Sequence, residues 1–592
     1  MSNKPSGLSR FWKEVKRRNV HRSLAIYAGT AFIILEAATI IFPRWDLPDW
    51  SIDLVLWLLI LGAVINVFVA WVFDITPQGL EKTKPIEEVA ESEKRSDSKG
   101  WKAATYLSLV VIIALIVLNT VGGPKQLQAG DIQSLVILPF DNFTGDDQLE
   151  YFVSGMHSSL IGDMGRIGGL RVLGKTSSNK YQDVDLSAPE IAKELEVDAV
   201  VEATVMCVGD SICLQVRVLS VFPEEKQLWI ADYKEEKGQI LNLYNHITKQ
   251  IADEVKVGLT AGEERQLEES RTVDPAALDA YMKGQYYWEL LNRDSVQRTL
   301  EYFQLATELD PEWADPWAGL ALAWGMFSFY EILPASSTNS MKTKFLNRAL
   351  ELNPNSAKAH FVNATHAVWS EWDWEKGEQE FLKSLELNPN DALTRLYYAH
   401  LLMILRRPDE ALQQATLGLE LDPLKGIVHF LYSMVLIHTG NYQTAIDFFE
   451  KILLTKPDSP LANSSILLPY YLTGDYEKWM QAWIRKVKWS DEAKASVVGA
   501  FNEEGHIAAI VEMFSLNEKY SPEDCYMSDG IKMIRYFHLN NYERVMDYYD
   551  KMYETISVDM AYLATSPIYE QMKDNARYLA LLKKMKLPLP KD

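Results

Sequence analysis

A proline recurs at nearly constant intervals through the second half of this chain. It lies in related segments such as ELNPNSAKAH, ELNPNDALTR and LTKPDSPLAN, at positions 311, 354, 389, 423 and 457. The last three intervals are almost equal, and the first is longer because of an insertion near ILPASSTNS. A repeat of this length is a helix pair that cannot bury its apolar face alone, so successive pairs must stack. The period therefore predicts an α-solenoid over residues 270–592.

Residue types inside each period indicate the tetratricopeptide repeat. Such repeats carry small and aromatic side chains at fixed helical positions, and a proline closes the second helix. Trp317 and Ala321 fit the first helix of a pair, and Phe381 fits the second. The turn GNY at 440–442 returns one period later as GDY at 474–476. Because several positions recur together, the pattern is more specific than any single motif.

Stacked repeats form a superhelix whose concave groove is lined mainly by the first helix of each pair. Projecting the period onto the chain places eight side chains there, which we expect to bind a partner: Lys358, Phe361, Leu396, His400, Met403, Phe430, Met434 and His438. The alternative for each apolar residue is packing between repeats, which stacking also requires. The two histidines lack the spacing of a metal site, so we predict no metal there.

Three long apolar segments precede the repeats, at residues 24–42, 52–73 and 104–123. Each is long enough for a helix to cross the hydrocarbon core of a bilayer, and no small-residue cleavage site follows the first segment. We therefore predict three transmembrane helices. Glu36 lies inside the first one. An acidic residue at that depth is functional, or it is accommodated by a hydrogen bond between helices or by protonation.

The basic residues predict how the chain crosses the membrane. Seven Lys and Arg lie in the N-terminal segment 1–23 and six in the linker 74–103, whereas the loop 43–51 and the stretch just after the third segment have one each. Cytoplasmic loops carry the excess of basic residues. We expect the N-terminus and the linker in the cytoplasm, and the chain from about residue 124 onward outside it, in the periplasm of a Gram-negative cell.

Residues 131–259 show a mixed pattern of strands and helices. SLVILPF reads as a buried strand, and SAPEIAKELEV starts with a helix cap followed by an early proline. Two alternating runs meet at Gly209-Asp210, which predicts a hairpin with a two-residue turn. A strand and an amphipathic helix follow. The segment is therefore predicted to be a small α/β domain, and the whole chain a membrane-anchored α+β protein.

The faces of the hairpin predict its register. With a two-residue turn, Glu202 opposes Arg217 and Cys207 opposes Ile212, so that polar meets polar and apolar meets apolar. A slip by one residue would reverse the faces of one strand. This register puts Cys207 and Cys213 on different faces, so we expect no disulfide between them. Three scattered cysteines are in any case no disulfide framework.

The segments SLVILPFDNFTGDDQLEYFVSGMHSSLI, LRVLGKTSS, VDAVVEATV and LWIADYKEE resemble the FlgO-type domain, also called TolB amino-terminal-like. The opening FWKEVKRRNVHRSLAIYAGTAFIILEAATIIFPRWDLPDW and AWVFDITPQGLEK resemble the membrane region of the same multi-domain bacterial proteins. The resemblance implies location in a bacterial inner membrane and no catalytic residues. Some relatives carry a nucleotide-cyclase or winged-helix effector in the cytoplasm, for which the segment 1–23 is too short.

Charge and motifs argue against other classes of function. The net charge of −22 disfavours nucleic-acid binding, because an acidic surface repels phosphates. The sequence contains no phosphate-binding loop, no H-E-x-x-H zinc helix and no G-x-S-x-G nucleophile elbow. We therefore predict no catalytic, cofactor-binding or metal-binding residues, and no enzyme.

Together, these features predict a non-enzymatic interaction protein, a scaffold or sensor in the cell envelope. Its repeats would bind a protein or peptide partner outside the cytoplasm. The alternative is a regulatory subunit or relative of a membrane signalling enzyme of the cyclase kind, or of a transcription regulator, that has lost its effector domain.

Overall fold

The structure is a computed structural model. It describes residues 27–28, 31, 34–35, 55–63, 73–76 and 79–82, and residues 132–589 except 183, 222–224, 269–270, 291–292, 330–334, 488, 521–528 and 566–568. The chain divides into two compact units, Met1–Lys125 and Gln126–Asp592.

The first unit holds the predicted membrane segments, most of which lie outside the described residues. Glu36, the N-terminal segment 1–23 and the third segment 104–123 lie entirely outside them. Residues 55–63 of the second segment are helical, and the hydroxyl of Tyr27 donates a hydrogen bond to the carbonyl of Leu59 at 2.8 Å. A short hairpin joins β1 (Phe73–Thr76) to β2 (Gly79–Lys82). Within the described part of the chain, no single helix combines the length and apolar character that crossing a bilayer requires.

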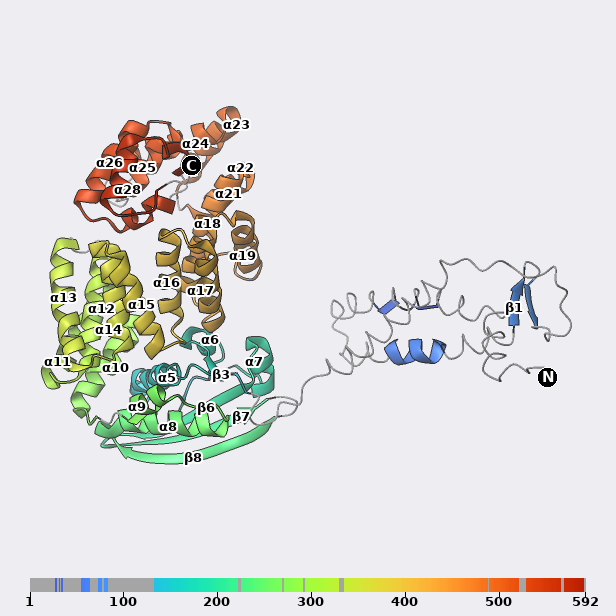
Figure 1. Cartoon of the computed structure of the whole chain (residues 1–592), viewed down its shortest axis with the longest axis vertical. Helices are drawn as coiled ribbons and strands as arrows, with labels where there is room; N and C mark the ends of the chain where they lie inside the picture. Colours follow the sequence, from blue (N-terminus) through green and yellow to red (C-terminus); the bar gives the residue numbers. More distant parts are fainter. Residues whose placement is uncertain are drawn as a thin grey trace, which may run out of the picture. The chain divides into compact units, whose positions relative to one another are not determined.

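The second unit begins with an α/β part built on a six-stranded mixed sheet of order β5-β3-β6-β7-β8, with β4 paired to β6 (Figure 1). Its elements are β3 (Ser134–Ile137), β4 (Asp141–Asn142), η4 (Asp147–Leu149), α5 (Glu150–Met164), β5 (Arg171–Val172), α6 (Lys175–Asn179), α7 (Ala188–Leu195), β6 (Ala199–Val208), β7 (Ser211–Ser220), β8 (Lys226–Glu236), η5 (Lys237–Gln239), α8 (Ile240–Glu254) and α9 (Ala261–Glu268). Helices α5 and α8 bury one face of the sheet, and α7 packs on residues of the other.

The β6–β7 hairpin has the predicted register from Ala199 to Val205 but not next to the turn. There Val208 opposes Ile212, so three residues lie between the last opposed pair and not the predicted two. Glu202 opposes Arg217, as predicted. The register then shifts by one residue between Val205 and Cys207, which brings Cys207 opposite Cys213, and the two form a disulfide. The prediction that these cysteines do not bridge is therefore wrong. The physical reason is a bulge, because one unpaired residue moves every later residue of its strand to the other face.

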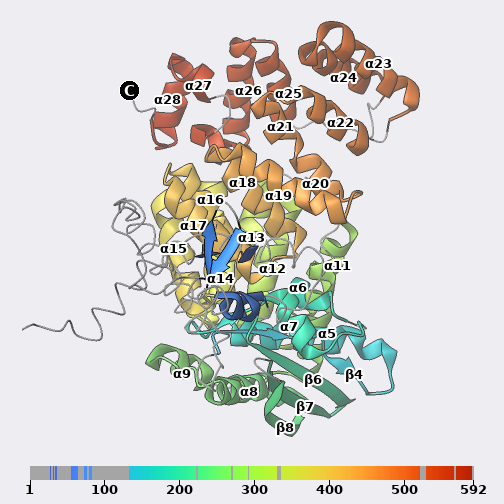
Figure 2. The same cartoon turned by 90° about the vertical axis from the view of Figure 1, so that its right-hand side faces the viewer.

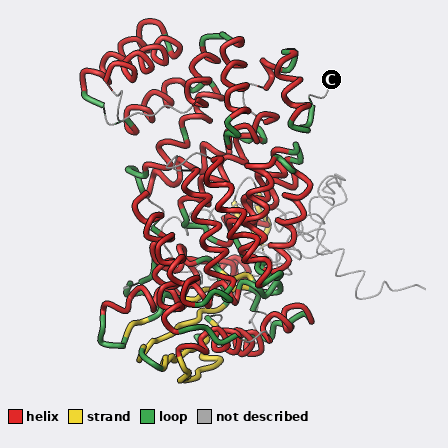
Figure 3. The backbone as a smooth tube through the Cα atoms, turned by 90° about the vertical axis from the view of Figure 1, so that its left-hand side faces the viewer, coloured by secondary structure: helices red, strands yellow, loops and turns green. Residues whose placement is uncertain are grey.

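The helical part of the second unit is a solenoid of paired helices (Figure 2). Its elements are α10 (Pro275–Glu289), α11 (Arg293–Leu309), α12 (Ala314–Phe329), α13 (Ala335–Leu352), α14 (Ala357–His366), η6 (Ala367–Glu371), α15 (Trp374–Leu387), α16 (Ala392–Ile404), α17 (Pro408–Leu421), α18 (Gly426–His438), α19 (Tyr442–Thr455), α20 (Pro460–Ser465), α21 (Leu467–Thr473), α22 (Tyr476–Lys486), α23 (Asp491–Glu504), α24 (His506–Tyr520), α25 (Asp529–His538), α26 (Tyr542–Glu554), η7 (Val558–Thr565), α27 (Tyr569–Met572) and α28 (Ala576–Lys584). Strands β3–β8 lie together at one end of this array (Figure 3).

The predicted period is confirmed by where the second helices begin. Helices α15, α17, α19 and α22 start at the evenly spaced positions 374, 408, 442 and 476. Two positions before each start, a residue with positive φ ends the preceding turn: Trp372, Arg406, Gly440 and Gly474. A left-handed residue commonly ends a helix, and glycine adopts that conformation without steric cost. The longer first interval between the prolines is taken up by longer helices, since α12 and α13 have 16 and 18 residues.

Two repeat boundaries of the solenoid dock on the α/β part. At the first, the Asn390 side-chain amide donates to the carbonyls of Gly165, Ile167 and Leu170 at 3.1, 3.0 and 2.9 Å, and its oxygen accepts from the amide N–H of Val172 at 3.1 Å. One side chain thus satisfies four backbone groups of the loop between α5 and β5.

The second docking contact is made one repeat later by Asp422, which is 3% exposed. Its carboxylate accepts hydrogen bonds from the backbone N–H and the hydroxyl of Ser177, at 3.0 and 2.6 Å. The N–H of Gly174 also donates to the carbonyl of Leu421 at 2.7 Å. Two contacts one repeat apart fix both the position and the direction of the solenoid on the α/β part.

We expect Asn390→Ala to loosen this junction. The carbonyl of Leu170 and the N–H of Val172 lose their partner, whereas the carbonyls of Gly165 and Ile167 each keep a backbone N–H donor. Each buried polar group left unsatisfied costs about 1–3 kcal/mol, part of which water recovers. We expect a loss of about 2–4 kcal/mol of stability and faster hydrogen exchange over residues 165–172. Asn355 occupies the same place in the preceding repeat and is exposed, so Asn355→Ala is the matched control. Equal exchange in the two variants would contradict the assigned role.

Candidate functional site

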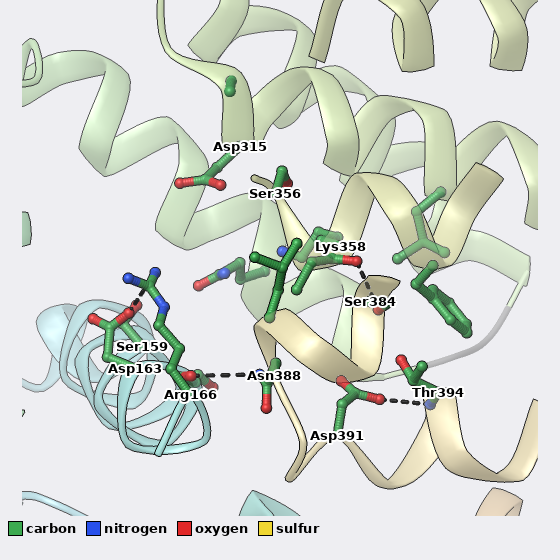
Figure 4. Close-up of a pocket in the computed structure, with 18 of the residues that line it drawn as sticks. Ser159, Asp163, Arg166, Asp315, Ser356, Lys358, Ser384, Asn388, Asp391 and Thr394 are labelled. Atoms are coloured by element: carbon green, nitrogen blue, oxygen red, sulfur yellow. Dashed lines mark hydrogen bonds and ion pairs between the residues drawn. The ribbon is translucent and has the colours of Figure 1, made fainter. Parts of the chain in front are cut away.

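A cavity of about 1220 Å³ lies between the α/β part and the first helices of the solenoid (Figure 4). Helix α5 and the turn that follows it form one wall. There Asp163, in the helix, pairs with Arg166, in the turn, at 2.8 Å. Helices α10, α12, α14 and α16 form the facing wall, which carries Asp315 and Lys358. Because Asn390 and Asp422 hold the two parts together, the cavity is preformed by the docked domains.

The lining of the cavity is polar and electrically balanced. Its charged side chains are five basic and five acidic: Arg166, Lys175, Arg271, Lys358 and Lys425, with Asp163, Glu289, Glu312, Asp315 and Asp391. Their formal charges cancel, so the cavity presents no field of one sign. Sites of this kind select a ligand by the placement of individual groups rather than by net charge.

Most of these charges already have a partner. Lys175 pairs with Glu289 at 2.7 Å and donates to the hydroxyl of Ser154 at 2.8 Å. Burial lowers the pKa of Lys175 and raises the pKa of Asp163, although the nearby opposite charges act against both shifts. Asp391 caps α16 by accepting from the N–H of Thr394 at 2.7 Å. Such groups build the walls of the site and have little capacity left for a ligand.

Aromatic rings form the apolar part of the lining. Tyr281 of α10 lies 4.6 Å from Trp313, between ring centroids, and Phe361 of α14 lies 5.5 Å from Tyr397 of α16. Rings held against one another in this way offer rigid contact area, which is the usual anchor of a binding pocket.

The eight side chains predicted to line a concave groove do not share one surface. Lys358 and Phe361 line the cavity. Leu396, His400 and Met403 are buried, with exposures of 0%, 1% and 1%. Phe430, Met434 and His438 are half-buried. Partner binding by this set as a whole stays a prediction.

The chain's own C-terminal region occupies the part of the concave face around His400. His400 Nε2 donates to the carbonyl of Leu431 at 3.0 Å, and its Nδ1 accepts from the hydroxyl of Tyr562 in η7 at 2.9 Å. The indole N–H of Trp369 donates to the same Tyr562 oxygen at 3.2 Å. Nδ1 of His438 donates to the carbonyl of Thr565 at 2.9 Å. These side chains therefore hold η7 in this structure and are not free to contact a partner.

Sequence reasoning missed the contribution of α10 and of α5 to the site. Tyr281 and Gln285 precede the first proline that marks the period, so the projection did not reach them. The spacing of Gly284 and Tyr287 matches the tetratricopeptide first helix and could have revealed α10. No pattern in the sequence indicates that α5 would face the repeats.

Comparison with known proteins supports the repeats directly. The tetratricopeptide repeat family model matches residues 380–413, which run from α15 into α17. A Rhizobium meliloti (strain 1021) protein named "Putative adenylate cyclase 3" is 29% identical over 199 residues, which are 34% of this chain and 33% of that protein. The chain thus matches about a third of the length of this curated relative.

Solved structures also match parts of the chain. The pilF protein of Pseudomonas aeruginosa is 19% identical, with a TM-score of 0.28 over 36% of this chain and 93% of the other. A human IFIT1 dimer with m7Gppp-AAAA is 14% identical, with a TM-score of 0.35 over 53% of this chain and 77% of the other. The match to the family model and the even spacing of the second helices together place tetratricopeptide repeats in the solenoid.

Acid should weaken the packing of η7. Burial lowers the pKa of His400 and of His438 to about 4, so the unfolded chain binds more protons than the folded one between pH 6.5 and 4. Stability therefore falls as the pH drops through this window. We expect His400→Gln, which cannot be protonated, to reduce the slope by up to about 1.4 kcal/mol per pH unit. Urea unfolding from pH 7 to 4.5 measures it.

The control for this experiment is His246→Gln, because His246 is exposed and lies on α8, away from η7. It measures the effect of losing one exposed imidazole elsewhere in the chain. Identical slopes for wild type and His400→Gln would show that His400 is not a buried neutral partner of Tyr562.

Proposed function

We propose that this chain is a membrane-anchored, non-enzymatic interaction protein whose repeats bind a protein or peptide partner in the cavity beside α5. The observation that carries the proposal is the cavity itself. Its volume of about 1220 Å³ exceeds the roughly 300–1,000 Å³ that is usual for small-molecule pockets. First helices of the solenoid form much of its lining, which is the surface that such repeats offer to partners.

The chemistry of the lining supports a peptide rather than a nucleic acid. A peptide backbone presents donors and acceptors in equal number, and the amides of Gln285, Asn353 and Asn388 in the lining offer both. Paired aromatic rings would anchor apolar side chains. A nucleic acid would instead require a clear excess of basic residues, which the balanced lining lacks.

Exposed apolar residues support the membrane anchor. In the helical residues 55–63, Trp57, Leu58 and Leu61 are 67%, 58% and 56% exposed. A helix in water seldom presents three large apolar side chains so close together, whereas lipid would solvate them. The basic residues on either side place the repeats outside the cytoplasm in this proposal. The Cys207–Cys213 disulfide supports that placement, since oxidising compartments favour such bonds.

We also infer that the α/β part is a FlgO-type domain, which acts here as a rigid wall of the binding site. The alternative function is regulation of a membrane signalling enzyme, which the similarity to a relative named as an adenylate cyclase favours. Identification of the bound partner separates the two, because the alternative requires that partner to be a nucleotide cyclase or another signalling enzyme.

The membrane arrangement can be tested with fusions to alkaline phosphatase, which is active only outside the cytoplasm. The fusion at residue 265 should be active and the fusion at residue 90 inactive, because basic residues are concentrated in the linker 74–103. The reverse pattern would refute the arrangement.

In the same cells, the peptide that contains Cys207 and Cys213 should be recovered with its disulfide intact when no reductant is added.

The binding site can be tested by photocrosslinking in intact cells. A photoreactive amino acid at Ser356, in the cavity, should link the chain to a discrete partner, whereas one at Leu454, which is 83% exposed on the solenoid surface, should not. Phe361→Ala should reduce the crosslink from position 356 by about five-fold or more, as expected for an anchor worth roughly 1 kcal/mol or more. Equal crosslinking from both positions would refute the proposed site.

A further inference from the structure

Strand β8 forms one edge of the sheet in the α/β part. It is 11 residues long, Lys226–Glu236, and among the described strands it pairs with β7 alone. In two perpendicular views it is the outermost element of the α/β part, and no described helix lies beyond it (Figures 1 and 2). An edge strand presents a row of unpaired N–H and C=O groups to any second strand that reaches it. This row is long, because β8 has about twice the length of a typical strand.

The hydrogen bonds between β7 and β8 show which backbone groups of β8 are unpaired. The N–H of Lys237 donates to the carbonyl of Asp210 at 2.9 Å, just beyond the opposed pair Ser211 and Glu236. A bond in this place flanks a non-hydrogen-bonded pair, and the two kinds of pair alternate along an antiparallel ladder. The residues whose N–H and C=O groups point away from β7 are therefore Ile230, Asp232 and Lys234. Among the described residues, none of these groups has a backbone hydrogen-bond partner.

Two copies of β8 can pair antiparallel about a two-fold axis, with three registers near the middle of the strand. Centred on Asp232, the strands bring this aspartate opposite its own copy, and like charges directly opposite are destabilising. Centred on Ala231, they bring Lys234 opposite Leu228, the bulge residue that has no partner in β7. Centred on Tyr233, they bring Asp232 opposite Lys234 of the second copy, twice. The last register alone matches the charges and stays within the regular part of the strand.

Both charged side chains are available for this contact. Lys234 is exposed and, among the described residues, takes part in no ion pair. Asp232 is also exposed and accepts one hydrogen bond, from the side-chain amide of Gln215 at 2.7 Å, which leaves its second carboxylate oxygen free. A lysine on an edge strand commonly prevents pairing, because it would be buried against the second strand without a partner. In the register centred on Tyr233 an aspartate opposes it, so the same lysine favours pairing.

We propose that the α/β part binds a second copy of this chain through β8, with the strands antiparallel and Tyr233 on the two-fold axis. The two sheets then form one continuous sheet. Tyr233 packs edge-on against His246 of α8, with ring centroids 5.8 Å apart. It meets its copy at a non-hydrogen-bonded pair, where opposed side chains are closest. This interface is separate from the cavity, because no residue of β8 lines the cavity.

The first test is disulfide crosslinking in intact cells that express the full-length chain. Cys525 is replaced by Ser in every variant, since Cys207 and Cys213 are already bonded to each other. Tyr233→Cys places a thiol on the two-fold axis, where the Cα atoms of a non-hydrogen-bonded pair are about 4.5 Å apart. That separation suits a disulfide, so oxidation with copper phenanthroline should give a covalent dimer.

The matched control is Ala231→Cys, on the same face of the strand. In the proposed register Ala231 opposes Glu235, so the two copies of position 231 lie four residues apart, roughly 14 Å along the strands. A disulfide cannot span that distance. We expect at least five times more covalent dimer from Tyr233→Cys than from Ala231→Cys. Equal yields, or no dimer from the first variant, would overturn the proposed pairing.

Exchange of charges tests the same interface with Tyr233 intact, and it still decides if Tyr233→Cys does not fold. Two differently tagged full-length copies are expressed together, and the capture of one through the tag of the other is measured. Asp232→Lys in both copies opposes lysine to lysine and should lower capture at least five-fold, as should Lys234→Asp in both. One copy of each variant opposes opposite charges again and should restore capture to within two-fold of the wild type.

Lys193→Asp, at an exposed lysine of α7, is the control for the change of charge and should leave capture unaltered. No capture between wild-type copies would show that the chain does not pair with itself. Capture that the changes at positions 232 and 234 leave unaltered would show that the copies meet at another surface. Either result overturns the proposal, and neither affects the proposed binding in the cavity.

Discussion

The side chain of Asn390 is the contact on which the arrangement of the second unit depends. It satisfies four backbone groups of the loop after α5, and Asp422 adds a second contact one repeat further along. Two separated contacts prevent rotation as well as sliding, so α5 faces the first helices of the solenoid at a fixed distance. The two parts also share one apolar core, which contains Met156 of α5 and Met282 of α10, so the junction rests on packing as well as on these hydrogen bonds.

The same solenoid uses its concave face in two ways. Near α14 the face opens to the cavity, where Lys358 and Phe361 are available to a ligand. Around α16 and α18 it is filled by η7, whose Tyr562 reaches His400 and Trp369. The second region differs from the first because residues of η7 bond directly to it. One part of the repeat surface is therefore open to a ligand, and the other part is covered by the chain's own C-terminal region.

Much of the local structure could be predicted from the sequence, because its causes are local. The repeat period located the starts of the second helices, and the alternation of polar and apolar residues predicted the hairpin register between Ala199 and Val205, the part away from the turn. The register failed at the next step, since a bulge depends on how the strand twists against its neighbours. The residue that the bulge leaves unpaired moves Cys207 opposite Cys213, and the two form a disulfide. The residues of the site could not be predicted for a different reason, because its two walls come from segments far apart in the sequence.

The sequence by itself determined that the chain contains stacked helix pairs, that an α/β segment precedes them, and that long apolar segments come first. Each of these features follows from a sequence period or a local composition that can be recognised within a stretch about as long as one repeat. Only the tertiary structure decided which repeat residues face a cavity and which are buried beneath η7. Tyr281 and Lys358 lie 77 residues apart, and His400 and Tyr562 lie 162 apart. Contacts at such separations depend on the accumulated superhelical turn of the repeats and on the Asn390 junction, which no local pattern encodes.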